Sequence, residues 1–511
     1  DGNYPDGRSI WRAKLNPDAA GTWIYTASFR RGANIAIDLN ANAGTSISFN
    51  GDSSSFSVAD KDPNAPGFLK YGELEYAGGH FFKFRDGPHW IKGGADSPEN
   101  ILGFADFDNT PQTNFGAGKV MTYSNHVQDW QTGDPTWSNG KGKGLIGALN
   151  YLSSVGVNSI YFLPMNIGGD ARDTHPYADT SINWGGGKDS GNDNLHMDVS
   201  KLQQWDIVFS HAQKKGIFLH FVLAEAECGN KEELDNKLLG VERKLYYREL
   251  VARFAQHNAL QWNLAEEYDY TCPINATEVK RWAQYMQDVD PYDHPITVHN
   301  QGSLHSKWDT FVGDSRFSVT SFQMATNTAS NGAVVEEWRT FTKNRGRPIV
   351  ISLDELRTTT TGNQASQRRD ILWPTFLSGG QTEWFVSENN GDQSLDNFRT
   401  YENLYKWTGY AITFMTDIPI NDMNPNDGLL TGESGSGQVF AKAGEVYAIY
   451  LPSGGSGNLN LASGTYRQRW YNPRTGLYEG TERTINGGSS VSLGTAPSTT
   501  SEDWVVLIQK V

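Results

Sequence analysis

The sequence predicts an α/β fold in which a (β/α)8 TIM barrel is flanked by an N-terminal and a C-terminal β-sandwich. Two observations lead to this prediction. Between residues 88 and 418, eight apolar strand-like runs alternate with helical patterns, and a closed (β/α) barrel needs eight strands. On either side, short runs that alternate apolar and polar residues are separated by turn residues, as in β-sandwiches. We therefore place domains at 1–86, 87–420 and 421–511 of the 511 residues.

The N-terminal domain is predicted from six short strand-like runs. Gly, Asn, Asp and Ser separate them, and the segment DPNAPG at 62–67 is a natural linker to the next domain. Six short runs leave a sandwich short of its first strands, so we expect this domain to be incomplete. The runs are SIWRAKL, GTWIYTASF, NIAIDL, SISFN, SSFSVA and FFKF.

The barrel is predicted from longer apolar runs that follow helical patterns. Tyr246, Leu250 and Phe254 recur every four residues, as on one face of a helix, and Gly216 and Gly346 stand where a helix ends before a strand begins. The eight runs are HWIKGG (89–94), SIYFLPMN (159–166), GIFLHFVLAE (216–225), ALQWNLAEE (259–267), PITVHN (295–300), SVTSFQM (318–324), PIVISLDE (348–355) and EWFVSE (383–388).

The C-terminal domain is predicted from a return to short strands after Pro419 and the turn-rich segment NDMNPNDG. No helical period is evident in this part of the sequence. We therefore expect a second β-sandwich that the last strand closes. Its runs are QVFAKA, EVYAIYL, NLNL, TYRQRWYN, SVSL and DWVVLIQK.

The composition of the chain limits the classes of molecule that the protein is expected to bind. The net charge of −15 disfavours nucleic acid and anionic membranes, because both attract basic surfaces. The chain also lacks an apolar run of about 18 residues, the length that would span a membrane. Aromatic residues make up 12% of the chain, and there are 54 glycines. Glycine-rich loops that present aromatic faces suit neutral sugars, although most of the aromatics belong to the core.

The two cysteines indicate the cellular compartment in which the protein is expected to work. Cys228 and Cys272 lie shortly after the third and fourth strand-like runs. If those strands are neighbours in a parallel sheet, both cysteines are at the same end and within reach of a disulfide; otherwise they are two separate thiols. A disulfide would require an oxidising compartment, so we expect a secreted, periplasmic or cell-surface protein.

Carboxylates gather where the predicted strands end, and these ends carry the chemistry in a (β/α) barrel. The sequence has no HExxH, GxSxG or phosphate-loop pattern and no dinucleotide GxGxxG after a strand, so we expect neither a metal nor a cofactor. Paired carboxylates remain, which is the chemistry that cleaves glycosidic bonds. We expect four of them, Glu225, Glu227, Glu266 and Asp354, to contact substrate, with a structural salt bridge as the alternative for Glu225 and Glu227. The residues concerned are Glu225, Glu227, Glu266, Glu267, Asp354, Glu355 and Glu388.

Further polar and aromatic residues lie at or near the same strand ends, and we predict that they contact substrate. Each also has a simpler interpretation. The loop residues after the first strand would cap their own loop, a histidine inside an apolar strand would be packed in the core, and Trp384 would pack there instead of stacking on a sugar. These candidates are Lys92, Asp96, Glu99, Asn100, His220, His299, Asn300, Gln323 and Trp384.

Two strand ends resemble those of clan A glycoside hydrolases, namely WNLAEE at 262–267 and the apolar run that ends in LDE at 353–355. More broadly, the chain resembles bacterial glycosidase-like proteins with an N-terminal domain of unknown function and a C-terminal module named for collagen binding. The segments that carry this likeness are KGGADSPENILGFADFDNT (92–110), NGKGKGLIGALNYL (139–152), MNIGGD (165–170), ERKLYYRELVARFAQHNALQWNLAEE (242–267), DPYDHPITVH (290–299) and YNPRTG (471–476).

The resemblance implies a retaining hydrolase of a polysaccharide or of an oligosaccharide derived from one. Glu267 matches the acid/base position and Glu355 the nucleophile position, with Asp354 as the alternative nucleophile. Glu266 stands where clan A enzymes usually have asparagine. Two other functions fit the same residues. One is a polysaccharide lyase, with Lys92, Arg172 or Arg357 neutralising a uronate; the other is a carbohydrate-binding or surface protein without activity.

Overall fold

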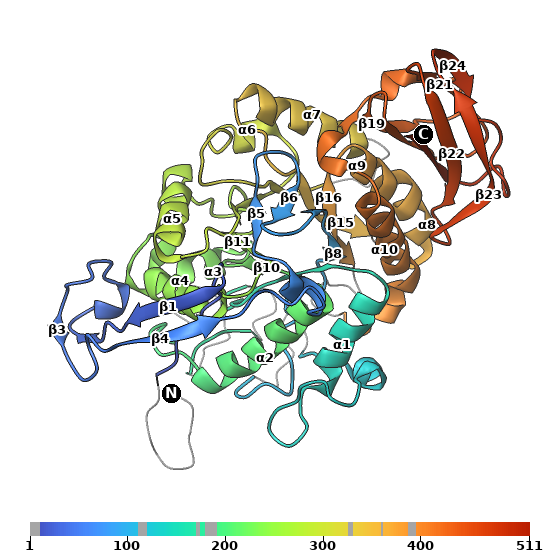
Figure 1. The fold of residues 1–511 in the computed structure, drawn as a ribbon. Helices are drawn as coiled ribbons and strands as arrows, with labels where there is room; N and C mark the ends of the chain where they lie inside the picture. The colour runs from blue at the N-terminus through green and yellow to red at the C-terminus, as the bar shows by residue number, and fades with distance from the viewer. Residues whose placement is uncertain are drawn as a thin grey trace.

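The computed structural model describes residues 11–110, 120–169, 174–178, 192–324, 331–358, 361–386 and 395–511, with the backbone alone at 356–358 and 361. A parallel barrel surrounded by helices lies at its centre, with the N-terminal and C-terminal β regions on different sides of it (Figure 1). Among the described helices, none combines the length and the apolar character that crossing a membrane would require.

Each barrel strand overlaps one of the eight predicted runs, but the start of the first run, His89–Trp90, pairs in a different sheet. In the described residues, nine parallel segments pair in the order β12, β11, β10, β9, β8, β16, β15, β14, β13. Only Val298 separates β12 from β13, so this stretch closes the ladder and the barrel has eight strands. The bounds are β8 (Gly93–Ala95), β9 (Ser159–Phe162), β10 (Phe218–Val222), β11 (Leu260–Asn263), β12 (Ile296–Thr297), β13 (His299–Asn300), β14 (Ser321–Gln323), β15 (Ser352–Thr358) and β16 (Gln381–Val386).

Helices connect the strands and begin and end at the residues that the sequence marks. The Asp198 side chain caps α2 by accepting the Lys201 N–H at 3.0 Å, and Gly216 ends α2 with a φ of 72°. The helices are α1 (Lys143–Ser154), α2 (Val199–Lys215), α3 (Cys228–Glu233), α4 (Val241–Phe254), α5 (Ala276–Val289), α6 (His305–Trp308), α7 (Asn331–Asn344), α8 (Gln364–Gln367), α9 (Trp373–Leu377) and α10 (Glu402–Thr416).

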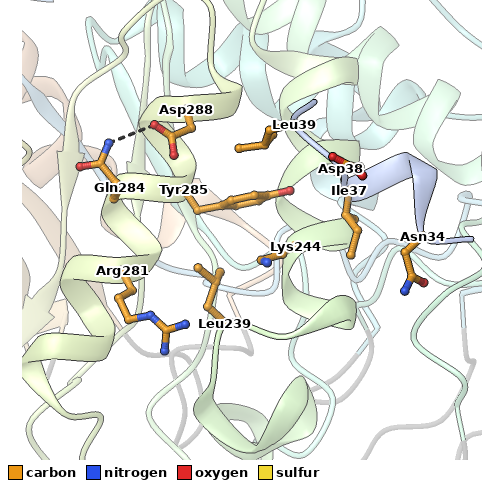
Figure 2. A pocket seen from close by; sticks show the side chains of 10 residues that line it. All are labelled: Asn34, Ile37, Asp38, Leu39, Leu239, Lys244, Arg281, Gln284, Tyr285 and Asp288. Carbon is orange, nitrogen blue, oxygen red and sulfur yellow. Dashed lines mark hydrogen bonds between the residues drawn. The ribbon is translucent and has the colours of Figure 1, made fainter. Parts of the chain in front are cut away.

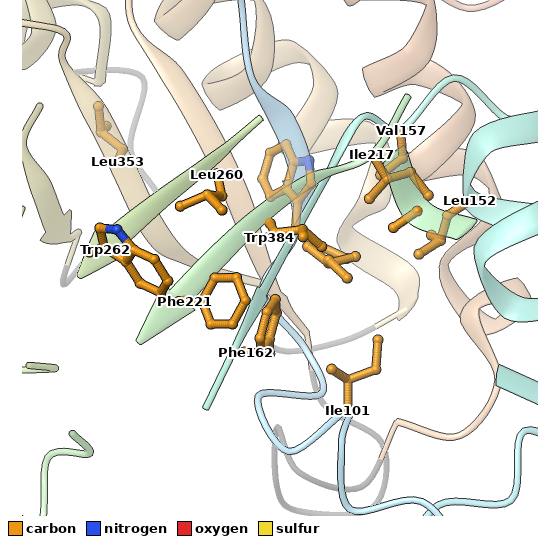
Figure 3. Packing of buried hydrophobic residues seen from close by; sticks show 14 of the residues in the cluster. Ile101, Leu152, Val157, Phe162, Ile217, Phe221, Leu260, Trp262, Leu353 and Trp384 are labelled. Atoms are coloured by element: carbon orange, nitrogen blue, oxygen red, sulfur yellow. The ribbon is translucent and has the colours of Figure 1, made fainter. Parts of the chain in front are cut away.

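The main core lies between the strands and the surrounding helices. Phe162 on β9 stacks on Phe209 of α2 at 5.2 Å between ring centroids, and Phe221 on β10 stacks on Phe254 of α4 at 5.9 Å. Figure 3 shows this packing around the strands, with Trp384 of β16 among the buried side chains. Since successive strand residues point to opposite sides, the residues between these apolar ones face the barrel axis.

A three-stranded antiparallel sheet, β5 (Leu74–Tyr76), β6 (Phe82–Phe84) and β7 (His89–Trp90), closes the bottom of the barrel. Its aromatic side chains share a buried cluster with Phe218, Ala259, Val319 and Val350, which lie where barrel strands begin. Residues 68–90 therefore belong to the barrel core, and the boundary that we predicted at 86 falls inside the hairpin of β6 and β7.

The N-terminal region differs from a two-layer sandwich. Its strands form two ribbons, β1 (Gly21–Thr26) with β4 (Ser53–Val58) and β2 (Arg30–Arg31) with β3 (Thr45–Ser46). Of residues 11–66, all of which the structure describes, none is buried. Two strands cannot cover each other's faces, so the alternation in the sequence does not produce a core here.

The C-terminal region is a sandwich of a six-stranded and a three-stranded sheet, with its own core between them. The outer face of the larger sheet joins the barrel core through Phe440, Tyr450 and Tyr471. Its strands are β17 (Asn424–Pro425), β18 (Leu430–Thr431), β19 (Gln438–Lys442), β20 (Val446–Leu451), β21 (Asn458–Leu461), β22 (Thr465–Asn472), β23 (Leu477–Asn486), β24 (Ser489–Ser492) and β25 (Trp504–Lys510).

A buried ion pair fixes the sandwich to the barrel. Arg368, in the helical turn between α8 and α9, donates to both carboxylate oxygens of Asp503 at 3.0 and 2.6 Å. Tyr450 donates to the same carboxylate at 3.0 Å. Because the larger sheet is covered on both faces, the C-terminal region is part of one continuous structure with the barrel.

Candidate active site

Glu355 reaches the barrel axis because β15 contains a β-bulge. Leu353 pairs with Thr382 and Leu356 with Trp384, so two residues of β15, Asp354 and Glu355, lie opposite one residue of β16. Regular alternation would send these two side chains to opposite faces. Instead Glu355 adopts a φ of 51°, and its side chain turns to the same interior as Asp354. Bulges commonly redirect a side chain in this way beside an active site.

Side chains of the two preceding barrel strands hold the Glu355 carboxylate. Gln323 at the end of β14 donates from Nε2 to Glu355 Oε1 at 3.2 Å, and His299 Nε2 on β13 lies 3.1 Å from Glu355 Oε2. Glu355 is 4% exposed, so these contacts occur in a largely dry environment. The Gln323 hydrogen bond and the nearby imidazole fix where the Glu355 carboxylate lies.

His299 also contacts Glu267, the other predicted catalytic residue. The backbone N–H of Glu267 donates to His299 Nδ1 at 3.1 Å. An amide can only donate, so Nδ1 carries no proton, and the ring proton is on Nε2, which lies 3.1 Å from Glu355 Oε2. Burial lowers the pKa of His299 to about 3, which keeps the ring neutral at physiological pH. One imidazole thus links the backbone of Glu267 to the carboxylate of Glu355.

The loop that follows β11 is held by a lysine and a disulfide. Glu267 begins this loop with a φ of 36°. Lys231 of α3 donates to the carbonyls of Glu267, Tyr270 and Thr271 at 2.8, 2.7 and 3.1 Å. A disulfide joins Cys228, at the start of α3, to Cys272, with 5.3 Å between the Cα atoms. The pairing that the sequence left open is therefore present, and it anchors the segment that carries Glu267.

Two more carboxyl groups crowd the same end of the barrel. Tyr161 donates to Glu266 Oε1 at 2.9 Å, and Asp96 Oδ2 accepts the backbone N–H of Glu355 at 2.6 Å. Burial raises the pKa of Glu266 well above its usual range, and the charges of Glu355 and Glu267 raise it further. Burial also raises the pKa of Asp96 strongly, with added repulsion from Glu383 and Glu266. We call Asp96, Glu266, Glu267 and Glu355 the carboxyl mouth.

One step back along the strands lies a second group, Lys92, His220, Asp354 and Glu383, which we call the ion-pair layer. Lys92 Nζ donates to Asp354 Oδ1 at 2.8 Å and to Glu383 Oε2 at 2.7 Å. His220 Nε2 accepts from Gln261 at 2.8 Å, so its Nδ1–H points to Glu383 Oε2 at 2.7 Å. All four side chains are fully buried and bonded to one another. This arrangement favours a structural role over substrate contact for Lys92, His220 and Asp354.

Trp384 packs in the core, which is the simpler of its two predicted roles. It points away from the barrel axis and donates from Nε1 to Thr408 of α10 at 2.9 Å, with no exposed surface. A buried ring on the outer face of β16 cannot stack on a sugar in the mouth. Core packing therefore replaces the stacking platform as the role of Trp384.

The other predicted residues lie around the mouth. Glu99 and Asn100 are buried in the loop after β8, and Asn300 is buried at the end of β13, where it donates to the Gly302 carbonyl at 2.6 Å. Glu225 is buried against Gly169, where an added Cβ would lie 1.2 Å from Glu225 Oε2. Glu227 precedes α3 and is partly exposed. The structure thus brings these residues to one end of the barrel.

Tyr161, Lys231 and Glu383 also belong to the site, although they are not among the residues that the sequence predicts. Glu383 had a usable signal, because a charged residue inside an apolar strand needs a buried partner, and Lys92 offers the same signal on the first strand. Tyr161 and Lys231 had none that separates them from ordinary core and helix residues. Arg172, Glu388 and the side chain of Arg357 lie outside the described residues.

Two clusters have the composition of a metal site, and neither is suited to one. In the first, His220, Asp354 and Glu383, the Lys92 ammonium already lies between the carboxylates. In the second, Glu266, His299 and Glu355, a metal on Nε2 of a neutral imidazole would need a proton on Nδ1. That proton would oppose the Glu267 N–H. The hydrogen bonds therefore favour a metal-free site at both positions.

A separate cavity of about 520 Å³ lies on the outer surface of the molecule. The N-terminal segment around Asp38 and the helices α4 and α5 surround it, with Tyr285 at its centre and Lys244 and Arg281 nearby (Figure 2). None of the predicted site residues lines it. This cavity is therefore distinct from the carboxyl mouth.

Comparison with known proteins supports the architecture. Residues 425–509 match a family model described as "Putative collagen-binding domain of a collagenase". Among curated proteins, none matches the chain. The barrel and its flanking regions are similar to solved structures.

Three of these structures cover most of the chain. A glycoside hydrolase family 5 protein of Bacteroides vulgatus aligns over 88% of this chain and 96% of its own, with 14% identity and a TM-score of 0.62. A second protein of that bacterium, provisionally named a glycoside hydrolase, aligns over 97% and 89%, with 15% identity and a TM-score of 0.63. A third, named only glycoside hydrolase, aligns over 87% and 98%, with 13% identity and a TM-score of 0.60. At these identities the likeness establishes the fold alone.

Proposed function

We propose that the protein is a retaining O-glycoside hydrolase that acts on a polysaccharide or on an oligosaccharide derived from one. The observation that carries the proposal is the pair of glutamates at the ends of β11 and β15. Glu267 and Glu355 both stand on left-handed backbone, which non-glycine residues rarely adopt and which gathers at functional sites. His299 connects them at 3.1 Å on each side.

In this proposal Glu355 attacks the anomeric carbon and forms a glycosyl-enzyme intermediate. Glu267 protonates the leaving oxygen and then removes a proton from the incoming water, which cleaves the intermediate and releases the sugar with its configuration retained. Gln323, which donates to Glu355 Oε1, and the His299 ring, 3.1 Å from Oε2, orient the attacking carboxylate. Each of these roles is consistent with the contacts of the described residues.

The fold adds support. The three solved structures that share this architecture over most of their length are named as glycoside hydrolases. In a (β/α) barrel the catalytic residues lie at the carboxyl ends of the strands, and the paired carboxyls of this chain are found there. Lys92, one of the three cations that a lyase could use here, is bound between Asp354 and Glu383. Arg172 and the side chain of Arg357, the other two, lie outside the described residues, so the contacts argue only against Lys92 as the partner of a uronate.

The test is turnover on a panel of polysaccharides and oligosaccharides, with product sizing and NMR of the anomeric proton. We expect a responsive glycan to release product of retained configuration, and Glu355→Gln to lower kcat by about 10⁴-fold. Products absorbing near 235 nm would instead show elimination. Binding without product over long incubation would leave only a carbohydrate-binding role. Inversion of configuration would refute the retaining mechanism.

A further inference from the structure

The bulge that directs Glu355 into the barrel is held by a side chain of a different strand end. In a regular parallel ladder the backbone N–H groups of a strand donate to carbonyls of the neighbouring strands. Here the Glu355 N–H donates to Asp96 Oδ2 at 2.6 Å. The Trp384 carbonyl on β16 accepts from the N–H groups of Asp96 and Ser97, at 3.0 and 3.3 Å, next to the pairing of Trp384 with Ala95 of β8. The backbone that carries Asp96 is thus held on β16 beside the bulge, and its side chain binds the bulged amide.

We propose that Asp96 is a positioning residue that locks the β15 bulge through the Glu355 amide and so keeps the Glu355 carboxylate facing the mouth. This inference rests on the proposed function for its catalytic consequence, because the carboxylate it positions is the proposed nucleophile. It assigns to Asp96 a role different from the substrate contact that the sequence predicts.

The surroundings of Asp96 fit such a role. Asp96 has no exposed surface. The groups that face it are the carboxyls of Glu383, Glu266 and Asp354, together with the phenol of Tyr405 on α10. Lys92, the lysine of the ion-pair layer, forms its ion pairs with Asp354 and Glu383. With no cation bonded to it among the described residues, Asp96 acts here as a hydrogen-bond acceptor for an amide.

This geometry separates what different substitutions should do. The carboxamide oxygen of Asp96→Asn can still accept the Glu355 N–H, whereas Asp96→Ala leaves the amide without its acceptor. Misplacing a reacting group by about 1 Å costs roughly 100-fold in rate. We expect Asp96→Ala to lower kcat about 100-fold with little change in KM, and Asp96→Asn to stay within about tenfold of the unsubstituted enzyme.

The matched control is Asp290→Ala. Asp290 is also a buried aspartate of the barrel, 5% exposed, and it accepts from Trp262 Nε1 at 2.8 Å at the opposite end of β11. Asp290→Ala removes a carboxylate that Trp262 and His294 contact, so it should lose stability, whereas only Asp96→Ala should lose turnover per folded molecule. A rise in KM without a fall in kcat for Asp96→Ala would overturn the proposal in favour of substrate contact.

A second readout needs no substrate. Hydrogen exchange followed by mass spectrometry should show faster exchange in the peptide covering 352–358 for Asp96→Ala and unchanged exchange for Asp96→Asn. If Asp96→Ala does not fold, Asp96→Leu fills the space without an acceptor and should give the same local increase. Faster exchange in Asp96→Asn, or none in any variant lacking the acceptor, would overturn the proposal.

Failure of this inference differs from failure of the proposed function. If Glu355→Gln is inactive while Asp96→Ala keeps its kcat, the hydrolase proposal stands and the lock is refuted. If Glu355→Gln keeps its activity, the catalytic assignment is refuted, and the exchange measurement alone decides whether Asp96 holds the bulge.

Discussion

The ion-pair layer and the carboxyl mouth use the same residue type for opposite purposes. In the layer, each carboxylate is bonded to Lys92, and His220 completes the group. In the mouth, four carboxyl groups lie together, and burial and mutual repulsion raise the pKa of Glu266 and of Asp96. The two groups meet at Asp354 and Glu355, which are adjacent in the chain and separated in role by one bulge.

The comparison distinguishes two kinds of buried carboxyl group, those paired with a cation and those that repel one another. A buried carboxylate with a partner stabilises the fold, or at least does not disrupt it, whereas buried carboxyls that repel one another destabilise the fold and persist where chemistry needs them. Substitutions in the layer should therefore mainly change stability, and substitutions in the mouth should mainly change turnover.

The largest expected effect is on turnover, at the mouth. Glu267→Gln should lower kcat by about 10²- to 10⁴-fold, because the amide cannot protonate the leaving oxygen. Its unfolding midpoint in urea should stay at or above that of the unsubstituted protein, because one repelling charge is gone. Substrates whose leaving group needs no protonation should recover much of the lost rate. Full activity on unactivated glycans would contradict the assignment.

The next effect is on stability, in the ion-pair layer. Lys92→Met should lower the free energy of unfolding by about 3–5 kcal/mol, because Asp354 and Glu383 would remain buried without their cation. Urea unfolding followed by tryptophan fluorescence measures it. The exposed Lys70 provides the control, and Lys70→Met should change the same quantity by less than about 0.5 kcal/mol. If the two variants unfold with equal free energies, the ion-pair layer does not stabilise the fold, and its contrast with the carboxyl mouth is wrong.

The disulfide tests how the mouth is anchored. Replacing both Cys228 and Cys272 by serine should lower the free energy of unfolding by about 2–4 kcal/mol, because the bond closes a loop with a sequence separation of 44. Turnover should fall as well, since the bond anchors the segment that begins with Glu267. Reduction of the unsubstituted protein should reproduce both changes. Unchanged stability and turnover would show that Lys231 alone holds the loop.

Trp384 separates core packing from substrate contact. Trp384→Phe should lower the free energy of unfolding by about 1–2 kcal/mol, because a buried hydrogen bond to Thr408 and some packing volume are lost. KM should not change. A rise in KM at unchanged stability would instead support stacking of Trp384 on the substrate.

The smallest effect, taken for each pH unit, is on the pH dependence of stability. Glu266 has its pKa raised by burial above the ordinary value of 4.5, so the folded protein loses stability as pH rises from 4.5 through the raised pKa. Glu266→Gln removes this loss. Its stability relative to the unsubstituted protein should therefore grow above pH 4.5, by at most about 1.4 kcal/mol for each pH unit. A constant difference from pH 4 to pH 8 would contradict the shifted pKa.

Much of the barrel could be predicted from the sequence, because apolar runs and glycine helix ends report directly on strands and their boundaries. The gathering of Glu267 and Glu355 was also predictable, since strand ends meet at one edge. The separation of Asp354 from Glu355 was not, because a bulge depends on pairing with β16 and on the loop after β8. Nor was the direction of Trp384, which the register of β16 decides.

The flanking regions show the same limit. Alternating runs predicted a sandwich at both ends of the chain, and only the C-terminal runs have a second layer to cover them. There the sheet also packs on the barrel, and Arg368 binds Asp503 across the junction. Alternating apolar and polar residues indicate which face of a strand is buried, but a core also needs a second sheet to cover that face. Among the described residues, the N-terminal ribbons have no such second sheet.

The most direct test of the central claim compares Asp354→Asn with Glu355→Gln in the same assays of turnover and unfolding. The claim is that one carboxylate belongs to the fold and its neighbour to the chemistry. We predict that Glu355→Gln loses about 10⁴-fold in kcat at nearly unchanged stability. We predict that Asp354→Asn loses stability and less than tenfold in turnover per folded molecule, since Lys92 would keep only Glu383 as a charged partner. Loss of turnover in Asp354→Asn with full activity in Glu355→Gln would contradict the account.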